Sequence, residues 1–472
     1  MFSRVNAFDF DVAIIGGGSG GYAAARTAAG AGLHTVVIEG GKEIGGLCIL
    51  RGCMPTKALL YAADVIHLAR HASTWGVQAP EVSFDFAHVM ARKNRMIKEF
   101  ADDRVRQLTG GKFKFIRAHA RFVDTHTLAL SNGETLTAKN FVVSTGSVVS
   151  PSPLSQLEKT GYLTSDEALT LVEAPKSLIV LGGGAVAVEF AQFFARFDTR
   201  VTLVQRSEHI LRVFDTDAAA ELEKVFRREG ITVFTGTKLV DVRREGDLKA
   251  VLFEHEGKTI RVAAEEILFA LGRTPNTAGL HLEKAGVTTE GPRIVTNLRL
   301  QTSAPQIYAA GDCTGPHEIV HIAIQQGEIA GHNIAHPAQA RRIDYRLLTH
   351  VVFTDPQIGT VGLTEKEAKA RNVPWLAASF PFNDHGKSLI MDAKDGFVKL
   401  LADPKTGEIL GGCCVGPMGG ELIHEIIAAM ARRMTVHDLG AMPHYHPTLA
   451  EIWTYPAEAL AGQIRVEQNL EN

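Results

Sequence analysis

Residues 11–21 read Asp-Val-Ala-Ile-Ile-Gly-Gly-Gly-Ser-Gly-Gly, and an Ala-rich run over residues 22–29 follows them. A strand, a glycine loop and a helix in this order are typical of a dinucleotide-binding unit, because glycines let the backbone approach a pyrophosphate at the helix N-terminus. The pattern predicts that Gly16, Gly18 and Gly21 line such a loop. Taken alone, the match is also compatible with a tight strand-to-helix turn.

The same pattern occurs again over residues 178–187, Leu-Ile-Val-Leu-Gly-Gly-Gly-Ala-Val-Ala, and a helix is expected over residues 188–197. Gly182 and Gly184 are the first two glycines of this second loop, and Ala187 takes the third place, where the pattern permits alanine. Two copies, each between a predicted strand and a predicted helix, favour a repeated nucleotide-binding unit over two coincidental turns.

The next strand of each unit ends in a polar residue at the same offset. Glu39 and Gln205 each stand 23 positions after the first glycine of their loop. A carboxylate at this place hydrogen-bonds a ribose hydroxyl, so the first unit has the acid and the second lacks it. Arg206 follows Gln205 directly. Two exposed polar strand ends explain each residue alone, but they do not explain the shared offset.

Further segments complete a coarse map of the fold. Strands that close on glycine are expected at residues 141–146, 266–273 and 307–312, and antiparallel strands at 396–401 and 409–415 precede a helix at 420–433. The predicted fold is therefore α/β, with two doubly wound, Rossmann-like dinucleotide-binding domains and a C-terminal α+β domain.

Composition excludes several classes of protein. The 472 residues contain 49 Lys and Arg against 52 Asp and Glu, a formal charge of −3, which excludes a strongly basic nucleic-acid-binding chain. The longest apolar and glycine run, residues 178–188, is shorter than the ~20 residues of a membrane span. Five cysteines do not form a secreted disulfide framework or a zinc ligand set. We expect a cytoplasmic protein with no metal site, no nucleic-acid partner and no membrane partner.

One pair of cysteines is close in sequence, within residues 45–57, Gly-Gly-Leu-Cys-Ile-Leu-Arg-Gly-Cys-Met-Pro-Thr-Lys. Pro55 suits the first turn of a helix through residues 58–71. Cys53 is then near the helix N-terminus, where the helix dipole favours the thiolate. The four residues between Cys48 and Cys53 can form a turn that brings the two sulfurs together.

This stretch resembles the redox-disulfide motif of the class I pyridine nucleotide–disulfide oxidoreductases, flavoproteins that include dihydrolipoamide dehydrogenase, glutathione reductase and mercuric reductase. The resemblance extends over nearly the whole chain. Its other motifs are the two glycine loops, Thr145-Gly146, Gly-Arg-Thr-Pro-Asn at 272–276, Gly311-Asp312, Val-Gly-Leu-Thr-Glu at 361–365 and His-Pro-Thr-Leu-Ala-Glu at 446–451.

The resemblance implies four segments. Residues 1–150 form the first part of an FAD-binding domain, and residues 151–274 form the NAD(P)H-binding domain. Residues 275–343 form the second, central part of the FAD-binding domain. Residues 344–472 form a dimerisation domain.

It also implies two cofactors, FAD and NADPH. In the FAD site, Gly16, Gly18, Gly21 and Glu39 hold the ADP part and Asp312 holds the ribityl chain, while the other expected contacts are Thr145, Gly146, Gly272, Arg273 and Gly311. In the NADPH site the expected contacts are Gly182, Gly184, Gln205, Arg206 and Arg212. The two arginines match the pair that holds the 2′-phosphate in NADPH-dependent members. NADH remains an alternative, because Gln205 can also bond the ribose of NAD.

The catalytic roles follow from the same resemblance. Cys53 is the sulfur next to the flavin, which forms a charge-transfer thiolate when reduced, and Cys48 is the interchange thiol that attacks the substrate disulfide. Lys57 and Glu189 form an ion pair beside the flavin. A cation at that place stabilises the negative charge of the reduced flavin.

His446 is the expected general acid and base, and Glu451 orients its ring. In this family that histidine reaches the disulfide of the other subunit, so the resemblance implies a homodimer. His444 lies nearby in sequence and competes for the role, but only His446 precedes the Pro-Thr and Glu run.

The predicted function is transfer of electrons from NADPH through FAD to the Cys48–Cys53 disulfide and on to a small or protein-bound disulfide. The alternatives are an NAD-linked dihydrolipoamide dehydrogenase and a metal or quinone reductase of the mercuric reductase type. Arg51 departs from the usual motif, and it either favours a thiolate or an anionic substrate or is simply solvated. Cys413 and Cys414 are expected in the core or at an interface.

Overall fold

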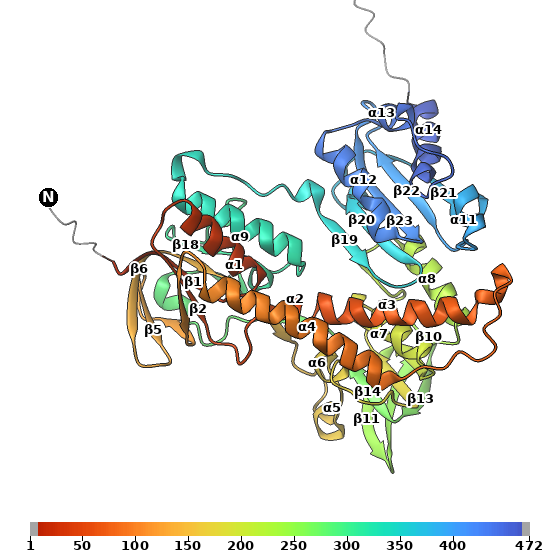
Figure 1. The fold of residues 1–472 in the computed structure, drawn as a ribbon, viewed down its shortest axis with the longest axis horizontal. Helices are drawn as coiled ribbons and strands as arrows, with labels where there is room; N and C mark the ends of the chain where they lie inside the picture. The colour runs from red at the N-terminus through yellow and green to blue at the C-terminus, as the bar shows by residue number, and fades with distance from the viewer. Residues whose placement is uncertain (1–7, 465–472) are drawn as a thin grey trace, which may run out of the picture. The chain divides into compact units, whose positions relative to one another are not determined.

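The computed structural model describes residues 8–464, and the chain divides into two compact units. Figure 1 shows their helices and strands along the chain. The first unit contains Met1–Thr56, Ala91–Pro151 and Gly272–Asp344, and the second contains Lys57–Met90, Ser152–Leu271 and Tyr345–Asn472. Each unit joins segments that are far apart in the sequence. The four segments implied by the family resemblance remain a prediction.

The first unit is built on a sheet whose core is parallel. The strand order is β3 (Lys114–Arg117), β2 (Thr35–Glu39), β1 (Phe10–Ile15) and β6 (Thr135–Val143), with β18 (Ile307–Ala309) also paired to β6. Strands β5 (Thr127–Leu130) and β4 (Ala120–Phe122) extend the sheet in antiparallel fashion. Strand β1 is buried except at Asp11, as expected for a central strand with helices on both faces. The predicted doubly wound fold is confirmed.

Helix α1 (Ser19–Gly30) follows β1 directly and packs closely against α9 (Val320–Ala335). A Cβ atom at Gly327 of α9 would collide with the carbonyl oxygen of Gly20, and one at Gly331 would lie 2.7 Å from the carbonyl oxygen of Ala24. The two helices therefore meet backbone to backbone. Any larger side chain at this contact would displace α1 and the glycine loop before it.

The second unit repeats the strand, loop and helix pattern. Its four-stranded parallel sheet has the order β10 (Thr232–Phe234), β9 (Arg200–Val204), β8 (Ser177–Leu181) and β14 (Glu266–Phe269), and α7 (Ala185–Arg196) follows β8. Both predicted helices begin three residues earlier than expected, because the last residues of each glycine loop already form the first helical turn.

Three antiparallel strands lie between β10 and β14 and were not predicted. They are β11 (Lys238–Glu245), β12 (Leu248–His255) and β13 (Lys258–Ala264). Each hairpin turns at a glycine in the left-handed region, Gly246 with φ 64° and Gly257 with φ 73°. Such two-residue turns suit the twist of the paired strands.

A five-stranded antiparallel sheet forms the C-terminal part of the second unit. Its order is β19 (Thr349–Val352), β20 (Gln357–Gly362), β23 (Ile409–Gly416), β22 (Phe397–Ala402) and β21 (Leu376–Pro381). Helices α12 (Gly419–Ala431) and α14 (Thr454–Gln463) pack on it. The predicted strands at 396–401 and 409–415 and the predicted helix at 420–433 are therefore present. Cys413 and Cys414 lie in β23, and both are buried.

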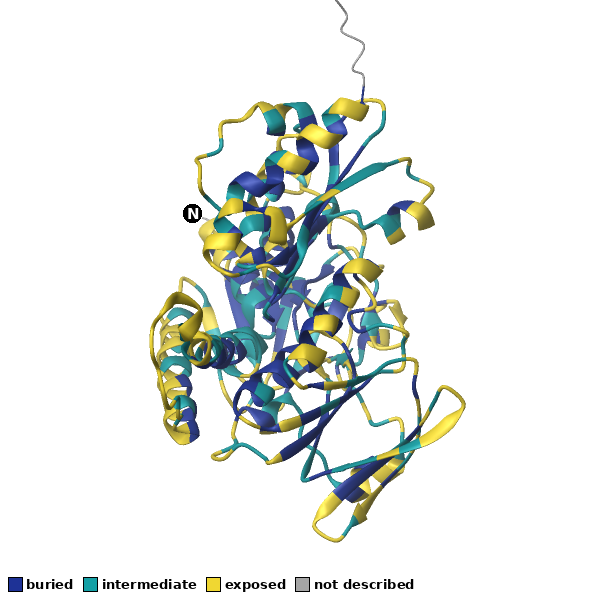
Figure 2. Ribbon diagram, turned by 90° about the vertical axis from the view of Figure 1, so that its right-hand side faces the viewer, coloured by how far each residue is buried: buried dark blue, intermediate teal, exposed yellow. Residues whose placement is uncertain are grey.

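Figure 2 shows many strands buried or half-buried, one largely exposed hairpin, and helices that are exposed on one side. The other helices and short strands complete the chain. They are α2 (Gly46–Leu50), α3 (Cys53–Arg70), α4 (Phe86–Thr109), α5 (Ser155–Thr160), α6 (Ser165–Ala168), α8 (Thr216–Arg228), α10 (Glu365–Ala370), α11 (Gly386–Ile390), α13 (Val436–Ala441), β7 (Ser147–Val149), β15 (Arg273–Pro275), β16 (Thr289–Glu290) and β17 (Arg293–Ile294). Within residues 8–464, no helix combines the length and apolar character that a membrane crossing needs.

The contact between α1 and α9 makes a testable prediction. Gly327→Ala should lower the free energy of unfolding by about 1–3 kcal/mol, because the added methyl group meets the backbone of Gly20. The urea midpoint of unfolding, followed by circular dichroism, measures this change. Gly30→Ala in α1 is the matched control, since open space surrounds that position and alanine favours the helix. Equal midpoints for both variants would contradict the close contact.

Candidate functional site

The first glycine loop is shaped by backbone contacts. Gly16 has φ 104°, and a Cβ atom there would collide with the carbonyl oxygen of Ser144 at the end of β6. Helix α1 then starts after Gly18 with no side chain capping its first N–H groups. Glu39 accepts hydrogen bonds from the N–H groups of Gly17 (2.8 Å) and Gly41 (2.6 Å). The uncapped helix end and this carboxylate give the arrangement expected for the ADP part of a dinucleotide.

In the same unit, several polar side chains lie at the strand ends next to that loop. The hydroxyl of Thr145 is buried and has no hydrogen-bond partner, and Gly146 follows with φ 70°. Ser147 donates to Asp312 (2.7 Å), and Arg273 donates to both the hydroxyl and the carbonyl of Ser147 (2.8 Å each). The orphaned hydroxyl and the glycine cradle fit a bound FAD.

Two of the predicted cofactor glycines have a structural role as well. Gly272, with φ 126°, precedes β15, and Gly311, with φ 83°, donates its N–H to the side chain of Gln326 (2.7 Å). Both conformations favour glycine, because an L side chain rarely adopts a positive φ.

The cysteine segment starts against the glycine loop. A Cβ atom at Gly46 would lie 2.7 Å from the Cα of Gly18, so helix α2 begins in direct contact with the loop. Cys48 lies in α2, and Cys53 is the first residue of the 18-residue helix α3. Both side chains are half-buried. The predicted helix start and the place of Pro55 in its first turn are confirmed, and a thiolate at Cys53 benefits from the helix dipole.

One turn further along α3, Lys57 pairs with Glu189 of α7. Its Nζ lies 3.0 Å and 2.9 Å from the two carboxylate oxygens, and Glu189 is only 3% exposed. Glu189 also accepts the N–H of Phe353 (3.0 Å), and the ring centroid of Phe353 lies 4.5 Å from the ammonium. The predicted ion pair is present, and its buried carboxylate is well satisfied.

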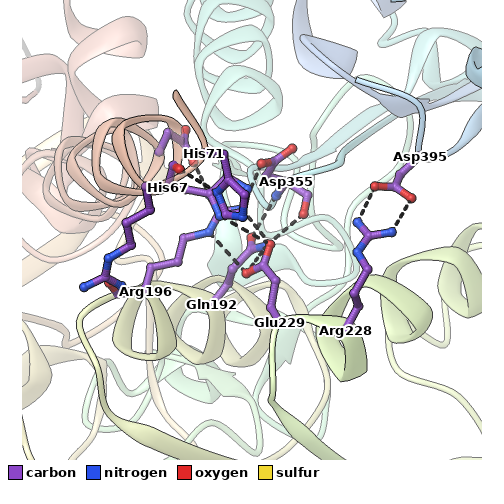
Figure 3. A network of polar contacts seen from close by, with 10 residues as sticks. His67, His71, Gln192, Arg196, Arg228, Glu229, Asp355 and Asp395 are labelled. Carbon is purple, nitrogen blue, oxygen red and sulfur yellow. Dashed lines mark hydrogen bonds and ion pairs between the residues drawn. The ribbon is translucent and has the colours of Figure 1, made fainter. Parts of the chain in front are cut away.

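A second charged contact joins the same two helices, and Figure 3 shows Arg196 with Gln192, Glu229 and Asp355 around it. Arg196 of α7 has its side chain 4% exposed and pairs with Asp64 of α3 (2.7 Å), Glu229 (2.8 Å) and Asp355 (2.8 Å). Gln192 bonds the backbone carbonyl and N–H of Asp355 (2.7 and 2.8 Å). Burial opposes the charge of Arg196, but Glu229 and Asp355 outweigh it and raise the pKa of the guanidinium.

The two contacts have the same spacing on both helices. Lys57 and Asp64 lie seven residues apart on α3, and Glu189 and Arg196 lie seven residues apart on α7. Seven residues are about two helical turns, so both pairs lie on matching faces. Long side chains therefore hold α3 in register with α7, the helix that follows the second glycine loop.

Three of the neighbouring side chains also form a potential ligand group. Ligand atoms of His67, Glu229 and Asp355 lie within 4.8 Å of one another. The guanidinium of Arg196 forms ion pairs with both carboxylates, so a protein cation already lies against this group. Burial, with the charge of Arg196, also lowers the pKa of His67 and keeps its ring neutral.

The second glycine loop repeats the first. Gly182 has φ 118°, and a Cβ atom there would collide with the carbonyl oxygen of Ala270. Gly184 precedes α7, again without a side-chain cap. The side chain of Gln205 lies over Gly183, where a Cβ atom would be 3.0 Å from its Cγ and Cδ. Glu39 has the same relation to Gly17, so the repeat predicted from the offset is present in space.

Arg206 and Arg212 follow β9, the next strand of this unit, and both are exposed. Among residues 8–464, neither forms an ion pair or a side-chain hydrogen bond. Their guanidinium groups are therefore available to a phosphate, the ligand for which arginine has the best geometry.

His446 and Glu451 lie in the C-terminal part of the second unit. The Nδ1 of His446 is 3.1 Å and 3.0 Å from the two oxygens of Glu451, and the imidazole is 77% exposed, whereas Glu451 is buried. The ring is thus held at one nitrogen and presents the other to solvent. His444 instead bonds Glu425 (2.6 Å) with its side chain only 7% exposed, so it does not compete for Glu451.

A second histidine that the sequence did not indicate also contacts Glu451. His385 is fully buried, and its Nε2 lies 3.3 Å from Glu451 Oε1 while its Nδ1 bonds Ser388 Oγ (2.8 Å). Burial lowers the pKa of His385 although the nearby Glu451 opposes this, and the charge of His446 acts in the same direction as burial. One of 19 histidines in a loop carries no local signal, so only the packing reveals this contact.

Comparisons with known proteins agree with this arrangement. Residues 10–327 match the family described as pyridine nucleotide-disulphide oxidoreductase, and residues 348–457 match the dimerisation domain of the same family. A dihydrolipoyl dehydrogenase of Thermus scotoductus is 38% identical over 460 residues, which cover 96% of this chain and 98% of the relative. A mercuric reductase of Staphylococcus aureus is 32% identical over 445 residues, which cover 94% of this chain and 81% of the relative.

A solved structure shares the whole fold. It is the HOCl-induced flavoprotein disulfide reductase of Escherichia coli, with a TM-score of 0.84 and 26% identity. The match covers 95% of this chain and 99% of that chain.

The buried His385 makes a prediction about pH. Its lowered pKa means that the unfolded chain takes up this proton at a higher pH than the folded protein does. Stability should therefore fall as pH drops below about 6.5, and the loss should be smaller in His385→Asn. Urea midpoints at pH 7.5 and 5.5 measure the difference, and His88→Asn on the exposed face of α4 is the control. The same pH dependence in wild type and His385→Asn would contradict this prediction.

Proposed function

Because the chain belongs to the pyridine nucleotide-disulphide oxidoreductase family, we propose that it passes two electrons from NADPH through FAD to a Cys48–Cys53 disulfide and then to a disulfide acceptor. The family assigns it as a flavin-dependent disulfide oxidoreductase. The observation that carries the proposal is the place of Cys53 at the first residue of α3, five positions after Cys48 in α2.

The exchange step uses the reduced cysteine pair. The Cys48 thiolate attacks one sulfur of the acceptor, the acceptor disulfide breaks, and a mixed disulfide and one thiolate product form. The Cys53 thiolate then attacks Cys48, which releases the second product thiolate and restores the Cys48–Cys53 disulfide. Two electrons leave the cysteine pair, and two protons complete the two product thiols.

His446 is proposed to hold and deliver these protons. Glu451 bonds its Nδ1, so Nε2 is the nitrogen that exchanges a proton with Cys48 and with the product thiolate. Glu451 also stabilises the imidazolium that forms when the ring takes a proton. The exposed ring suits action on a second subunit, in keeping with the dimerisation domain over residues 348–457 and the homodimer that it forms.

The cofactor residues keep their proposed roles. When bound, FAD would accept a hydride from the nicotinamide and pass two electrons to the disulfide. Gly16, Gly18 and Glu39 would hold its ADP part, and Asp312 its ribityl chain. Lys57, whose charge is held in place by Glu189, would supply the cation that favours the reduced flavin.

The coenzyme is proposed to be NADPH. The second unit has Gln205 where an NAD-binding unit carries an acid, and Arg206 and Arg212 are exposed and available to a 2′-phosphate. A second candidate is an NAD-linked dihydrolipoyl dehydrogenase, which the 38% identity to the Thermus scotoductus enzyme favours. Coenzyme preference separates the two candidates.

Substitution of the cysteines tests the thiol roles. Anaerobic reduction by NADPH should give the long-wavelength absorption of a thiolate beside the flavin, and Cys53→Ser should abolish this band. Cys48→Ser should retain it, and should show it without reductant. Cys313→Ser is the control, because burial raises the pKa of Cys313 to about 11 and keeps it as a thiol. A wild-type enzyme that never shows the band would contradict a redox role for the pair.

A second substitution tests the coenzyme. Wild-type kcat/KM should favour NADPH over NADH by roughly tenfold to a hundredfold, the value of one or two charge-assisted Arg–phosphate contacts. Gln205→Glu combined with Arg206→Met should erase or reverse the preference. Arg200→Met, an exposed arginine at the start of β9, should leave it unchanged. A clear wild-type preference for NADH would move the function to the dihydrolipoyl dehydrogenase candidate.

A further inference from the structure

An arginine that the family motifs do not include packs on α1, and the glycine loop before α1 contacts the start of the cysteine segment. Arg104 belongs to α4, and its Nε and Nη1 atoms are buried without a hydrogen-bond partner. Buried N–H groups of a guanidinium are normally satisfied, and an unsatisfied one is costly. Two such groups on one side chain point to a ligand that completes the site.

The guanidinium is held in place by Tyr22 of α1. Its Cζ lies 4.3 Å from the centroid of the Tyr22 ring, a cation–π contact that orients the plane of the group. This contact uses the face of the guanidinium and leaves its edge N–H donors uncommitted. Helix α1 is itself fixed by its backbone contact with α9, so the position of Arg104 is well defined.

Arg104 is also electrostatically coupled to Cys48. Burial lowers the pKa of Arg104, and a negative charge on Tyr22 or Cys48 opposes this shift. Asp103 and Arg26 are the other charged groups that act on it. Asp103 is engaged by Arg106 (3.1 Å) and by Gln107 (2.7 Å), so it does not neutralise Arg104 by a direct bond.

The other cations of this region already have carboxylate partners. Arg26 pairs with Glu328, and Arg51 pairs with Glu43. Arg51 was the cation that the sequence indicated near the cysteine pair, and it is exposed and ion-paired on the surface. Arg104 is the one of these three whose guanidinium forms no ion pair in the described part of the chain.

We propose that Arg104 is a specificity residue that binds a carboxylate of the acceptor, so that the enzyme prefers anionic disulfides over neutral ones. The inference rests on the proposed role of Cys48 as the attacking thiol. A carboxylate is the ligand that a guanidinium binds best, and its charge would satisfy the two orphaned N–H groups. The electron balance of the exchange is unchanged, because Arg104 holds the acceptor while Cys48 breaks its disulfide.

Alkylation of the reduced holoenzyme tests the site without turnover. Iodoacetate and iodoacetamide react with Cys48 by the same displacement of iodide, but only iodoacetate carries a carboxylate. The rates are measured by mass spectrometry of the Cys48 peptide. Arg104→Met should lower the iodoacetate to iodoacetamide rate ratio roughly tenfold, the value of one charge-assisted contact, and Arg104→Lys should retain part of it. Arg95→Met, an exposed arginine on the same helix, should leave the ratio unchanged.

Two outcomes of the alkylation overturn the inference. If Arg104→Met slows both reagents by the same factor, Arg104 only supports the Cys48 thiolate. If the variant loses FAD while the rate ratio stays constant, Arg104 is a cofactor contact. FAD absorbance and circular dichroism of each variant identify the second case.

Steady-state kinetics with charged and neutral disulfides provides a second test. Lipoate and lipoamide share a dithiolane ring and differ in charge, as do 5,5′-dithiobis(2-nitrobenzoate) and 4,4′-dithiodipyridine. In the wild type, kcat/KM should be higher for the anionic disulfide of each pair than for the neutral one. Arg104→Met should reduce this preference. If no disulfide is reduced but the alkylation ratio depends on Arg104, the anion site stands and the proposed function fails. If both disulfides of a pair are reduced with a ratio independent of Arg104, the inference fails and the proposed function stands.

Discussion

Both nucleotide loops depend on close contacts between backbones that only glycine permits. Gly16 turns against the carbonyl of Ser144, and Gly182 turns against the carbonyl of Ala270. These contacts fix where α1 and α7 begin, and they leave the first N–H groups of both helices uncapped. Gly46 extends the same principle, because its approach to Gly18 starts the cysteine segment directly at the first loop. Nucleotide site and thiol segment therefore share one backbone framework.

Two ion pairs between charged side chains hold helix α3 against helix α7. Lys57 with Glu189 and Asp64 with Arg196 connect α3 and α7 at two places with equal spacing. Buried ion pairs add little net stability unless further polar contacts complete them, and here the N–H of Phe353 and the carboxylates of Glu229 and Asp355 do so. We interpret the two contacts as a register device, which holds the helix that begins with Cys53 against the helix of the second glycine loop.

In the proposed mechanism, some residues serve any acceptor, and others select the acceptor or the coenzyme. The glycine loops, the cysteine pair and the His446–Glu451 contact serve any acceptor, since they concern electrons and protons. The choice of acceptor is proposed to lie with Arg104, and the choice of coenzyme with Gln205 and the two exposed arginines near it. The proposed choice of acceptor and the proposed choice of coenzyme both depend on arginines that have no carboxylate partner among residues 8–464. Both proposals thus assign an anionic group of the ligand to an arginine that forms no ion pair among residues 8–464.

Sequence alone determined the features whose signal is local. Glycine spacing and Pro55 after Cys53 involve residues a few positions apart, and Glu39 and Gln205 each stand 23 positions after a glycine within one strand–helix–strand unit, so the loops, the start of α3 and the repeated fold were predictable. The hairpins of β11–β13 were missed although their strands are seven or eight residues long, because β11 and β13 each have only one buried residue and so lack an apolar strand pattern. Contacts of His385 with Glu451, of Arg104 with Tyr22 and of Arg196 with Asp64 join residues 66, 82 and 132 positions apart. Tertiary structure alone decided these contacts, because a side chain's partner across the fold depends on packing that no periodic pattern records.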